Sequence, residues 1–214
     1  MLGTLISSCA KPHGMSTSAL PPSPIQGLRA IELTAGTEVL LQRFFDASPL
    51  YFVSVHGEPA LPGEAHDEIH DALPAGWPYT KKWVVGYVGE DGSLAAMANV
   101  VSDLLAPSVW HIGTFIVATS RHGKGDAQVL YRSLESWALR SGACWLRLGV
   151  VRGNARAERF WEREGFSQAR LRPGVEMGKL TNTLRVMFKP LAGGSREQYL
   201  ALVNRDRPEG ENAV

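Results

Sequence analysis

One stretch of the chain joins a β-branched segment to a helix through a glycine-rich turn, and this stretch restricts the fold most. Residues 112–119 are apolar and β-branched, which is typical of a buried strand. The turn at residues 121–127 (RHGKGDA) follows, and apolar side chains then recur at helical spacing up to residue 140. Such an order directs several backbone N–H groups toward one point at the positive end of a helix dipole. A bound phosphate suits that geometry.

The residue types in the turn agree with this interpretation. Gly123 and Gly125 allow the backbone to approach a pyrophosphate and to adopt φ values that other residues avoid. Lys124 adds a cation that can reach a phosphate. Glycine-containing turns before helices also occur without a ligand, so the turn alone leaves phosphate binding open.

The order of the other elements predicts the fold class. Helical periodicity appears at residues 37–47 and, more weakly, at 65–73, and a helix after Asn154 can end at Gly165. Strands are predicted at 28–33, 83–88, 94–103, 110–119, 144–151, 166–171 and 184–190. We therefore expect an α/β protein with a mixed sheet and helices on both faces. The unit around the glycine turn should be a right-handed crossover.

Length and composition suggest one domain with tails. The 214 residues divide into a disordered N-terminal tail (1–26), a folded domain (27–191) and a polar C-terminal tail (192–214) with one possible short helix at 196–204. The net charge of +1 gives no electrostatic case for a nucleic-acid or membrane-surface partner. No apolar run approaches the ~18 residues that a membrane-spanning helix needs.

The N-terminal segment and the cysteines suggest a cytoplasmic protein. The run Ile6-Ser7-Ser8-Cys9 superficially resembles a lipoprotein cleavage box, but no positive charge precedes it and its apolar run is short. Cys9 and Cys144 are the only cysteines and lie far apart, which does not support a disulfide framework. A reducing compartment fits these observations best.

Two motifs in the expected order give the chain a family resemblance. Residues 122–127 (HGKGDA) are similar to Q/R-x-x-G-x-G/A, and residues 154–157 (NARA) with 160–166 (FWEREGF) are similar to Asn-x-x-Ala followed by Phe-Tyr-x-x-x-Gly-Phe. The region from Phe115 to Phe166 thus resembles the acyl-CoA-binding core of the GNAT N-acetyltransferase superfamily. The resemblance implies a GNAT fold, in which a mixed, mostly antiparallel central sheet of about seven strands is flanked by helices on both faces.

The resemblance also implies acetyl-CoA as cosubstrate, without a metal. The strand before the turn would pair with the pantetheine arm as if with a peptide strand. The turn would hold the pyrophosphate, and Asn154 would contact the cofactor arm while also capping a helix. The residues assigned to the cofactor by this comparison are Phe115, Ile116, Val117, His122, Gly123, Lys124, Gly125, Asp126, Ala127, Asn154 and Trp161.

The chain departs from the family pattern at two positions. His122 stands where the family usually has Gln or Arg, and Trp161 stands where it usually has the tyrosine that protonates the leaving thiolate. An indole N–H cannot serve as a proton donor near neutral pH. Tyr131, on the helix after the turn, is a candidate substitute. Water is a second alternative, and a third is that the step needs no acid.

A general base must take the proton from the ammonium form of the acceptor. In several family members it is a carboxylate on the strand before the glycine turn, and His111 occupies that position. An unperturbed histidine pKa near ~6.5 suits this role. The alternatives are that His111 is structural or faces the wrong side, and that Asp103 is the base.

The segment at residues 66–70 (HDEIH) raises the question of a metal site. Two histidines at i and i+4 can share a helix face and bind zinc. However, Asp67 replaces the glutamate of His-Glu-x-x-His, and no third ligand follows along the chain. We therefore predict that His66 and His70 belong to a solvated polar helix without a metal.

The resemblance implies an acetyl-CoA-dependent N-acetyltransferase, an acyltransferase that moves acetyl to a primary amine by direct attack in a ternary complex. The acceptor would be a small-molecule amine or a peptide amine, and a homodimer is possible. The alternative is a non-catalytic acyl-CoA-binding or regulatory module, which Trp161 motivates.

Overall fold

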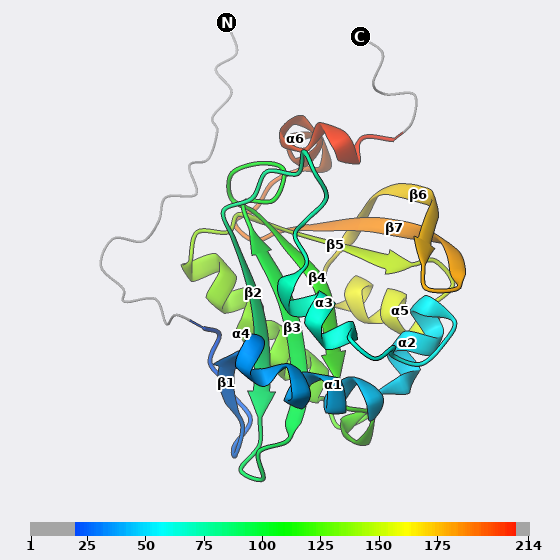
Figure 1. Cartoon of the computed structure of the whole chain (residues 1–214). Helices are drawn as coiled ribbons and strands as arrows, with labels where there is room; N and C mark the ends of the chain where they lie inside the picture. Colours follow the sequence, from blue (N-terminus) through cyan, green and yellow to red (C-terminus); the bar gives the residue numbers. More distant parts are fainter. Residues whose placement is uncertain (1–19, 209–214) are drawn as a thin grey trace, which may run out of the picture.

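A single mixed sheet of seven strands organises residues 20–208, the part of the chain that the computed structural model describes (Figure 1). The spatial order is β1-β2-β3-β4-β5-β7-β6, and β4 and β5 form the one parallel pair of neighbours in it. The strands are β1 (Arg29–Glu32), β2 (Lys81–Val88), β3 (Leu94–Ser102), β4 (Val109–Val117), β5 (Trp145–Val151), β6 (Ser167–Met177) and β7 (Leu180–Pro190). The predicted mixed, mostly antiparallel sheet is confirmed.

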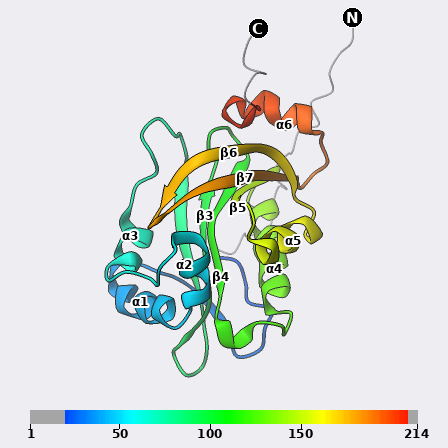
Figure 2. The same ribbon diagram turned by 90° about the vertical axis from the view of Figure 1, so that its right-hand side faces the viewer.

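Helices cover both faces of this sheet (Figure 2). On one face lie α1 (Glu38–Asp46), α2 (Pro49–His56) and α3 (Glu64–His70), and on the other lie α4 (Asp126–Arg140) and α5 (Ala155–Arg163). The apolar side chains that α4 repeats at helical spacing, among them Leu130, Leu134 and Trp137, are all buried against the sheet. The remaining helix is α6 (Arg196–Leu202), and short 3₁₀ turns lie at η1 (Ala35–Thr37), η2 (Thr119–Arg121) and η3 (Asn204–Asp206).

The sheet opens between β4 and β5. Their parallel pairing runs from Val109↔Trp145 to Ile112↔Leu148, although both strands continue beyond it. The β3–β4 register shifts at the same level, since Asn99 pairs with Thr114 and Val100 with Ile112. Gly113 is thus the extra residue of a β-bulge, and a bulge bends the strand that carries it. The bend and the end of pairing leave the second half of β4 with a free edge toward β5.

The segment predicted to be a polar C-terminal tail belongs to the folded domain. The predicted short helix is present as α6, and its Tyr199, Leu200 and the following Val203 are buried against Trp145 and Phe188 of the sheet. A domain boundary at residue 191 is therefore too early. At the other end, residues 20–26 contribute Leu20 and Ile25 to the core cluster under α4, while residues 1–19 lie outside the described part.

Two expectations that bear on the compartment have different outcomes. Cys144 is disulfide-bonded, so the expectation that the cysteines do not support a disulfide is wrong, and Cys9 lies outside the described residues. Within residues 20–208, no helix combines the length and the apolar character that crossing a bilayer requires.

Candidate active site

A cavity of about 250 Å³ lies where β4 and β5 diverge. β4 and β5 form its floor, α5 lines one side, and α2 and the β6–β7 hairpin lie opposite. Its lining includes the predicted residues His111, Phe115, Asn154 and Trp161. The structure thus brings together side chains that the sequence analysis assigned to both cofactor binding and catalysis.

The end of α2 is attached to the β6–β7 hairpin across this cavity. The backbone N–H of Lys179 donates to the His56 carbonyl at 2.8 Å, and Asn182 Nδ2 donates to the Val55 carbonyl at 2.9 Å. The Lys179 ammonium also lies 2.9 Å from the Glu58 carboxylate. These contacts join α2 and the hairpin into one continuous wall of the cavity.

The glycine turn has the geometry that an anion site needs. Gly123 and Gly125 adopt φ values of +80° and +84°, in the left-handed region that favours glycine. Within residues 20–208, the backbone N–H groups of residues 123–127 make no hydrogen bond. They stand at the start of α4, a helix of 15 residues, where the dipole adds roughly half a positive charge. Lys124 beside them is exposed.

His122 does not point into this anion site. Its Nε2 lies 2.9 Å from the Val117 carbonyl, and Arg156 Nη1 lies 2.9 Å from its Nδ1. Because the carbonyl can only accept and the guanidinium can only donate, Nε2 donates to Val117 and Nδ1 accepts from Arg156. His122 therefore fastens the turn to the end of β4 and to α5, which is a positioning role.

The free edge of β4 exposes only alternate residues. The N–H of Ala118 donates to Ala95 of the neighbouring segment, so residues 114, 116 and 118 direct their backbone groups toward β3. Phe115 and Val117 then direct theirs toward the opening beside β5. Of the three residues assigned to the pantetheine arm, Ile116 faces the wrong strand for that role. Phe115 has both groups available, whereas His122 already occupies the Val117 carbonyl.

Asn154 holds the position expected of a residue that both caps a helix and contacts a ligand. Its Oδ1 accepts from the Ala157 N–H at the start of α5, and its Nδ2 lies 3.4 Å from the Ser54 hydroxyl of α2. Trp161 lines the same cavity and packs edge-on against Tyr131, with ring centroids 5.3 Å apart. Both side chains therefore border the space that an acyl-CoA arm would occupy.

Tyr131 is placed unfavourably for the acid role. The side chain is fully buried and is absent from the cavity lining, and its hydroxyl accepts from the Lys189 ammonium at 3.5 Å. Burial and the nearby Glu135 carboxylate raise the pKa of Tyr131 further above its ordinary value. The hydroxyl thus has neither access to the cavity nor acidity that suits proton donation.

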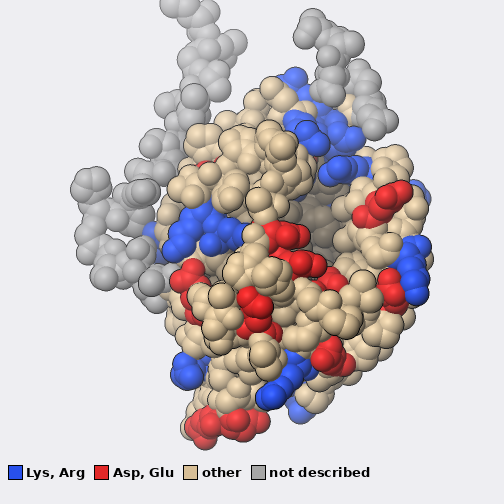
Figure 3. Space-filling view, in the orientation of Figure 1, with Lys and Arg blue, Asp and Glu red and all other residues tan. Residues whose placement is uncertain are grey.

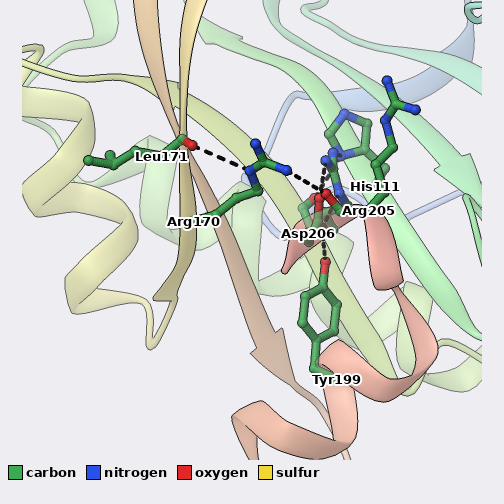
Figure 4. Close-up of polar contacts among 7 residues, drawn as sticks. His111, Arg170, Leu171, Tyr199, Arg205 and Asp206 are labelled. Carbon is green, nitrogen blue, oxygen red and sulfur yellow. Dashed lines mark hydrogen bonds and ion pairs between the residues drawn. The ribbon is translucent and has the colours of Figure 1, made fainter. Parts of the chain in front are cut away.

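His111 lies in the cavity wall, at the edge of a buried ionic network that the C-terminal segment completes (Figure 4). Its Nδ1 is 3.1 Å from the Arg147 carbonyl and 3.4 Å from Arg147 Nη1. The shorter contact needs the proton on Nδ1, and this tautomer leaves Nε2 as an acceptor. The Arg147 guanidinium makes a two-bond ion pair with Asp206, both at 2.8 Å, and Tyr199 donates to the same carboxylate. Burial and the charge of Arg147 lower the pKa of His111 to about 3. Such an imidazole is a weak base.

A polar cluster that the sequence did not predict lies beside the β4 bulge. Glu68 of α3 accepts hydrogen bonds from Asn99 Nδ2 and from the Thr114 hydroxyl, the latter at 3.0 Å. Tyr51, a cavity residue, lies within electrostatic range of Glu68, and burial together with the Glu68 charge raises the pKa of Tyr51 above its ordinary value. Burial raises the pKa of Glu68 above its ordinary value of 4.5, and Asn99 Oδ1 is buried without a partner within the described residues.

The only sequence signal for this cluster was Glu68 itself, inside the HDEIH segment. The two histidines of that segment raised only the question of a metal site. Nothing in the sequence shows that the opposite side of α3 faces β3 and β4. The contact depends on tertiary packing alone.

Comparison with known proteins agrees with the fold and with the motifs. The family model described as the acetyltransferase (GNAT) family matches residues 43–166, more than half of the chain. The chain therefore belongs to the GNAT acetyltransferase family. A search of curated proteins gives no significant match.

Solved structures with the same fold are N-acetyltransferases or related proteins. Spermidine N-acetyltransferase from Vibrio cholerae, in complex with CoA and spermine, has a TM-score of 0.60 at 15% identity and covers 78% of this chain and 98% of its own. Ribosomal-protein-S18-alanine N-acetyltransferase from Escherichia coli has a TM-score of 0.56 at 15% identity, with coverages of 78% and 96%. A GCN5-related N-acetyltransferase from Kribbella flavida has a TM-score of 0.55 at 22% identity, with coverages of 77% and 98%. At these identities the similarity shows the fold alone.

The turn provides a direct test of the anion site. A Cβ at Gly125 would meet nothing within 4 Å, so Gly125→Ala should fold with about 1–2 kcal/mol of backbone strain. The added methyl group lies where a phosphate would approach the free N–H groups, so we expect acetyl-CoA affinity to fall at least about tenfold. Isothermal titration calorimetry measures this change.

Gly92→Ala is the matched control, because Gly92 has a φ of +78° and equally open surroundings in the β2–β3 turn. It should have similar strain and unchanged acetyl-CoA affinity. Equal losses of affinity in both variants would remove the turn from cofactor binding.

Proposed function

We propose that this protein is an acetyl-CoA-dependent N-acetyltransferase that acetylates a primary amine by direct attack in a ternary complex. The observation that carries the proposal is the opening between β4 and β5, with a free backbone edge and a cavity next to a turn of unbonded N–H groups. The pyrophosphate would bind at residues 123–127, and the pantetheine arm would pair with Phe115. Membership in the GNAT family supports this arrangement.

In the proposed reaction the amine nitrogen attacks the carbonyl carbon of the thioester. A C–N bond forms and the C–S bond breaks, so that CoA leaves as a thiolate. The ammonium form of the amine loses two protons, one before the attack and one from the acylated nitrogen. The Phe115 N–H, which faces the opening, is positioned to donate to the thioester oxygen as negative charge develops on it. The cavity wall formed by α2 and the hairpin would hold the acceptor.

We assign the general-base role to Glu68, acting through the Tyr51 hydroxyl. Tyr51 borders the cavity, and the Glu68 carboxylate, which accepts from the Thr114 hydroxyl, is near enough to act on Tyr51 through its charge. A raised carboxyl pKa brings Glu68 closer to physiological pH, which favours proton transfer from an ammonium group. His111 is the second candidate, but its pKa of about 3 suits a hydrogen-bond acceptor for the amine better than a base.

The proton that neutralises the thiolate would also pass through Tyr51. Burial and the Glu68 charge raise the pKa of Tyr51 above its ordinary value, so its hydroxyl would relay a proton without remaining ionised. Trp161 occupies the family's usual tyrosine position, and Tyr51 is the tyrosine that lines the cavity within the described residues. Glu68 would take the ammonium proton before the attack, and the second proton, lost from the nitrogen as the C–S bond breaks, would pass through the relay to sulfur. Glu68 would then release its proton to solvent and regain its starting protonation state, so that the overall reaction is acetyl-CoA plus the ammonium form of the amine to N-acetylamine plus CoA plus one proton.

The acceptor is proposed only as a primary amine of a small molecule or of a peptide. The related structures include enzymes named for a polyamine and for a protein alanine. The homodimer, the cytoplasmic location and the lack of a nucleic-acid partner stay predictions.

Two measurements test this function together. Calorimetry should show acetyl-CoA binding with one site per chain, and a thiol-release assay over a panel of polyamines, amino acids, aminoglycosides and peptide N-termini should show turnover with at least one amine. The non-catalytic alternative, an acyl-CoA-binding module, predicts binding without turnover on every amine at every pH. Absence of acetyl-CoA binding would contradict both.

A further inference from the structure

We propose that Glu38, His66 and His70 form a binding site for a divalent transition-metal ion such as Zn²⁺, which links α1 to α3. This inference does not depend on the proposed acetyltransferase reaction. The sequence analysis predicted no metal because no third ligand follows the two histidines. The fold supplies the third ligand from 28 residues before His66, on a different helix.

The three side chains already converge. His70 Nε2 lies 2.7 Å from Glu38 Oε1, and His66 Nδ1 lies 3.3 Å from Glu38 Oε2. One ligand atom from each residue can be chosen so that all three lie within 4.8 Å of one another. The two imidazole rings are adjacent on α3, with centroids 4.5 Å apart. An ion between these atoms would need only small side-chain rotations to reach ordinary ligand distances of roughly 2.0–2.2 Å.

The donor set selects the kind of metal. Two imidazole nitrogens and one carboxylate suit Zn²⁺, Co²⁺, Ni²⁺ or Cu²⁺, whereas Mg²⁺ and Ca²⁺ prefer oxygen ligands. Three protein ligands leave at least one position for water. The side chains of Glu38, His66 and His70 are 30%, 60% and 40% exposed, so an ion can reach them from solvent.

The surrounding surface favours a cation. Figure 3 shows acidic side chains gathered over α3. Glu64, Asp67 and Asp71 lie in this helix or directly after it. Their negative potential would raise the local concentration of a divalent ion without adding specificity.

The position of α3 gives the site a consequence for the cavity side of the helix. His66 and His70 contact α1 on the outer side, while Glu68, between them in sequence, contacts Asn99 and Thr114 on the inner side. A metal that fixes α3 to α1 would therefore also fix the position of Glu68 relative to Asn99 and Thr114. The site would be structural, because its ligands face solvent and not the cavity.

Zinc binding to tag-free, full-length protein provides the test. After treatment with EDTA and gel filtration, titration with ZnCl₂ followed by calorimetry should show one site per chain, and bound Co²⁺ should give a visible absorption spectrum typical of nitrogen and oxygen ligands. The thermal midpoint should rise with ZnCl₂ and not with MgCl₂. His70→Asn and Glu38→Gln should each weaken zinc binding about 100-fold, as loss of one ligand from a three-residue site predicts.

Asp67→Asn is the matched control, since it removes a neighbouring acidic group from the same helix and should change the zinc affinity less than about twofold. Thermal melts in EDTA should show that all variants are folded. The proposal is overturned if zinc, cobalt and nickel show no saturable binding up to about 1 mM. Zinc binding that His70→Asn leaves unchanged would also overturn it, because the ion would then be bound elsewhere.

Discussion

Replacing Glu68 by glutamine is expected to lower kcat for the best amine by about 10²–10³-fold, the range that loss of a general base produces. Acetyl-CoA affinity should stay within about twofold, because Glu68 is not among the residues that line the cavity. The substitution should be tolerated structurally. Asn99 Oδ1 has no partner within the described residues and can accept from the new amide if the Asn99 side chain turns over.

Asp67→Asn on the same helix is the control for removing a negative charge, and it should leave kcat unchanged. The result that would exclude Glu68 as base is a rate for Glu68→Gln within about twofold of the wild type at all pH values. In that case His111→Ala would test the second candidate.

The pH dependence of kcat separates these two bases. Only the deprotonated base is active, so the rate rises with pH through the pKa of that base. If Glu68 is the base, the midpoint of the rise in rate should lie above pH 4.5, because burial raises the carboxyl pKa of Glu68, and the rise should be absent in Glu68→Gln. If His111 is the base, the midpoint should lie near pH 3. A stopped-assay profile over the acidic range, corrected for the ionisation of the amine, distinguishes these outcomes.

The second large effect concerns stability: Asp206→Ala is expected to lower the free energy of unfolding by about 3–5 kcal/mol. Its carboxylate forms a two-bond ion pair with Arg147, and the two side chains are 1% and 6% exposed. Removing the carboxylate leaves the buried guanidinium without its counter-charge and the Tyr199 hydroxyl without its acceptor. Urea denaturation at neutral pH measures the loss.

Two further variants show whether this loss comes from an uncompensated charge. Adding Arg147→Met to Asp206→Ala should recover part of the stability, because the buried charge is then absent. Glu197→Ala on the exposed side of α6 should leave the urea midpoint almost unchanged. A small effect of Asp206→Ala would mean that the C-terminal segment contributes little to the fold.

The ion pair also predicts the direction of a pH effect. Burial opposes ionisation of Asp206, but its hydrogen bonds and the charge of Arg147 hold the pKa of Asp206 below its ordinary value of 3.8. A carboxyl group with a lowered pKa in the folded state stabilises above the unfolded pKa, and this contribution disappears as pH falls through the folded pKa. The difference between the wild type and Asp206→Ala should therefore shrink below about pH 4.

Segments with strong local signals were predictable, and segments without them were not. The amphipathic α4 and the apolar β5 appear where their patterns place them. α2 was missed because its sequence, PLYFVSVH, is apolar nearly throughout and lacks the polar face that identifies a surface helix. β6 and β7 extend well beyond the predicted ranges. Their distal halves carry polar side chains and were therefore not predicted as strands, but they pair with each other across a hairpin.

By itself, the sequence determined the fold class, the glycine turn and the helix cap at Asn154, because turns, caps and hydrophobic periodicity are local properties of the backbone. Only the tertiary structure decided which distant groups meet: Asp206 with Arg147 beside His111, Glu68 with Thr114, and Glu38 with His66 and His70. It also showed that His122 bonds to the end of β4 and that the Tyr131 hydroxyl faces Lys189. These contacts depend on how α3, α6 and the sheet pack, and no local pattern encodes that packing.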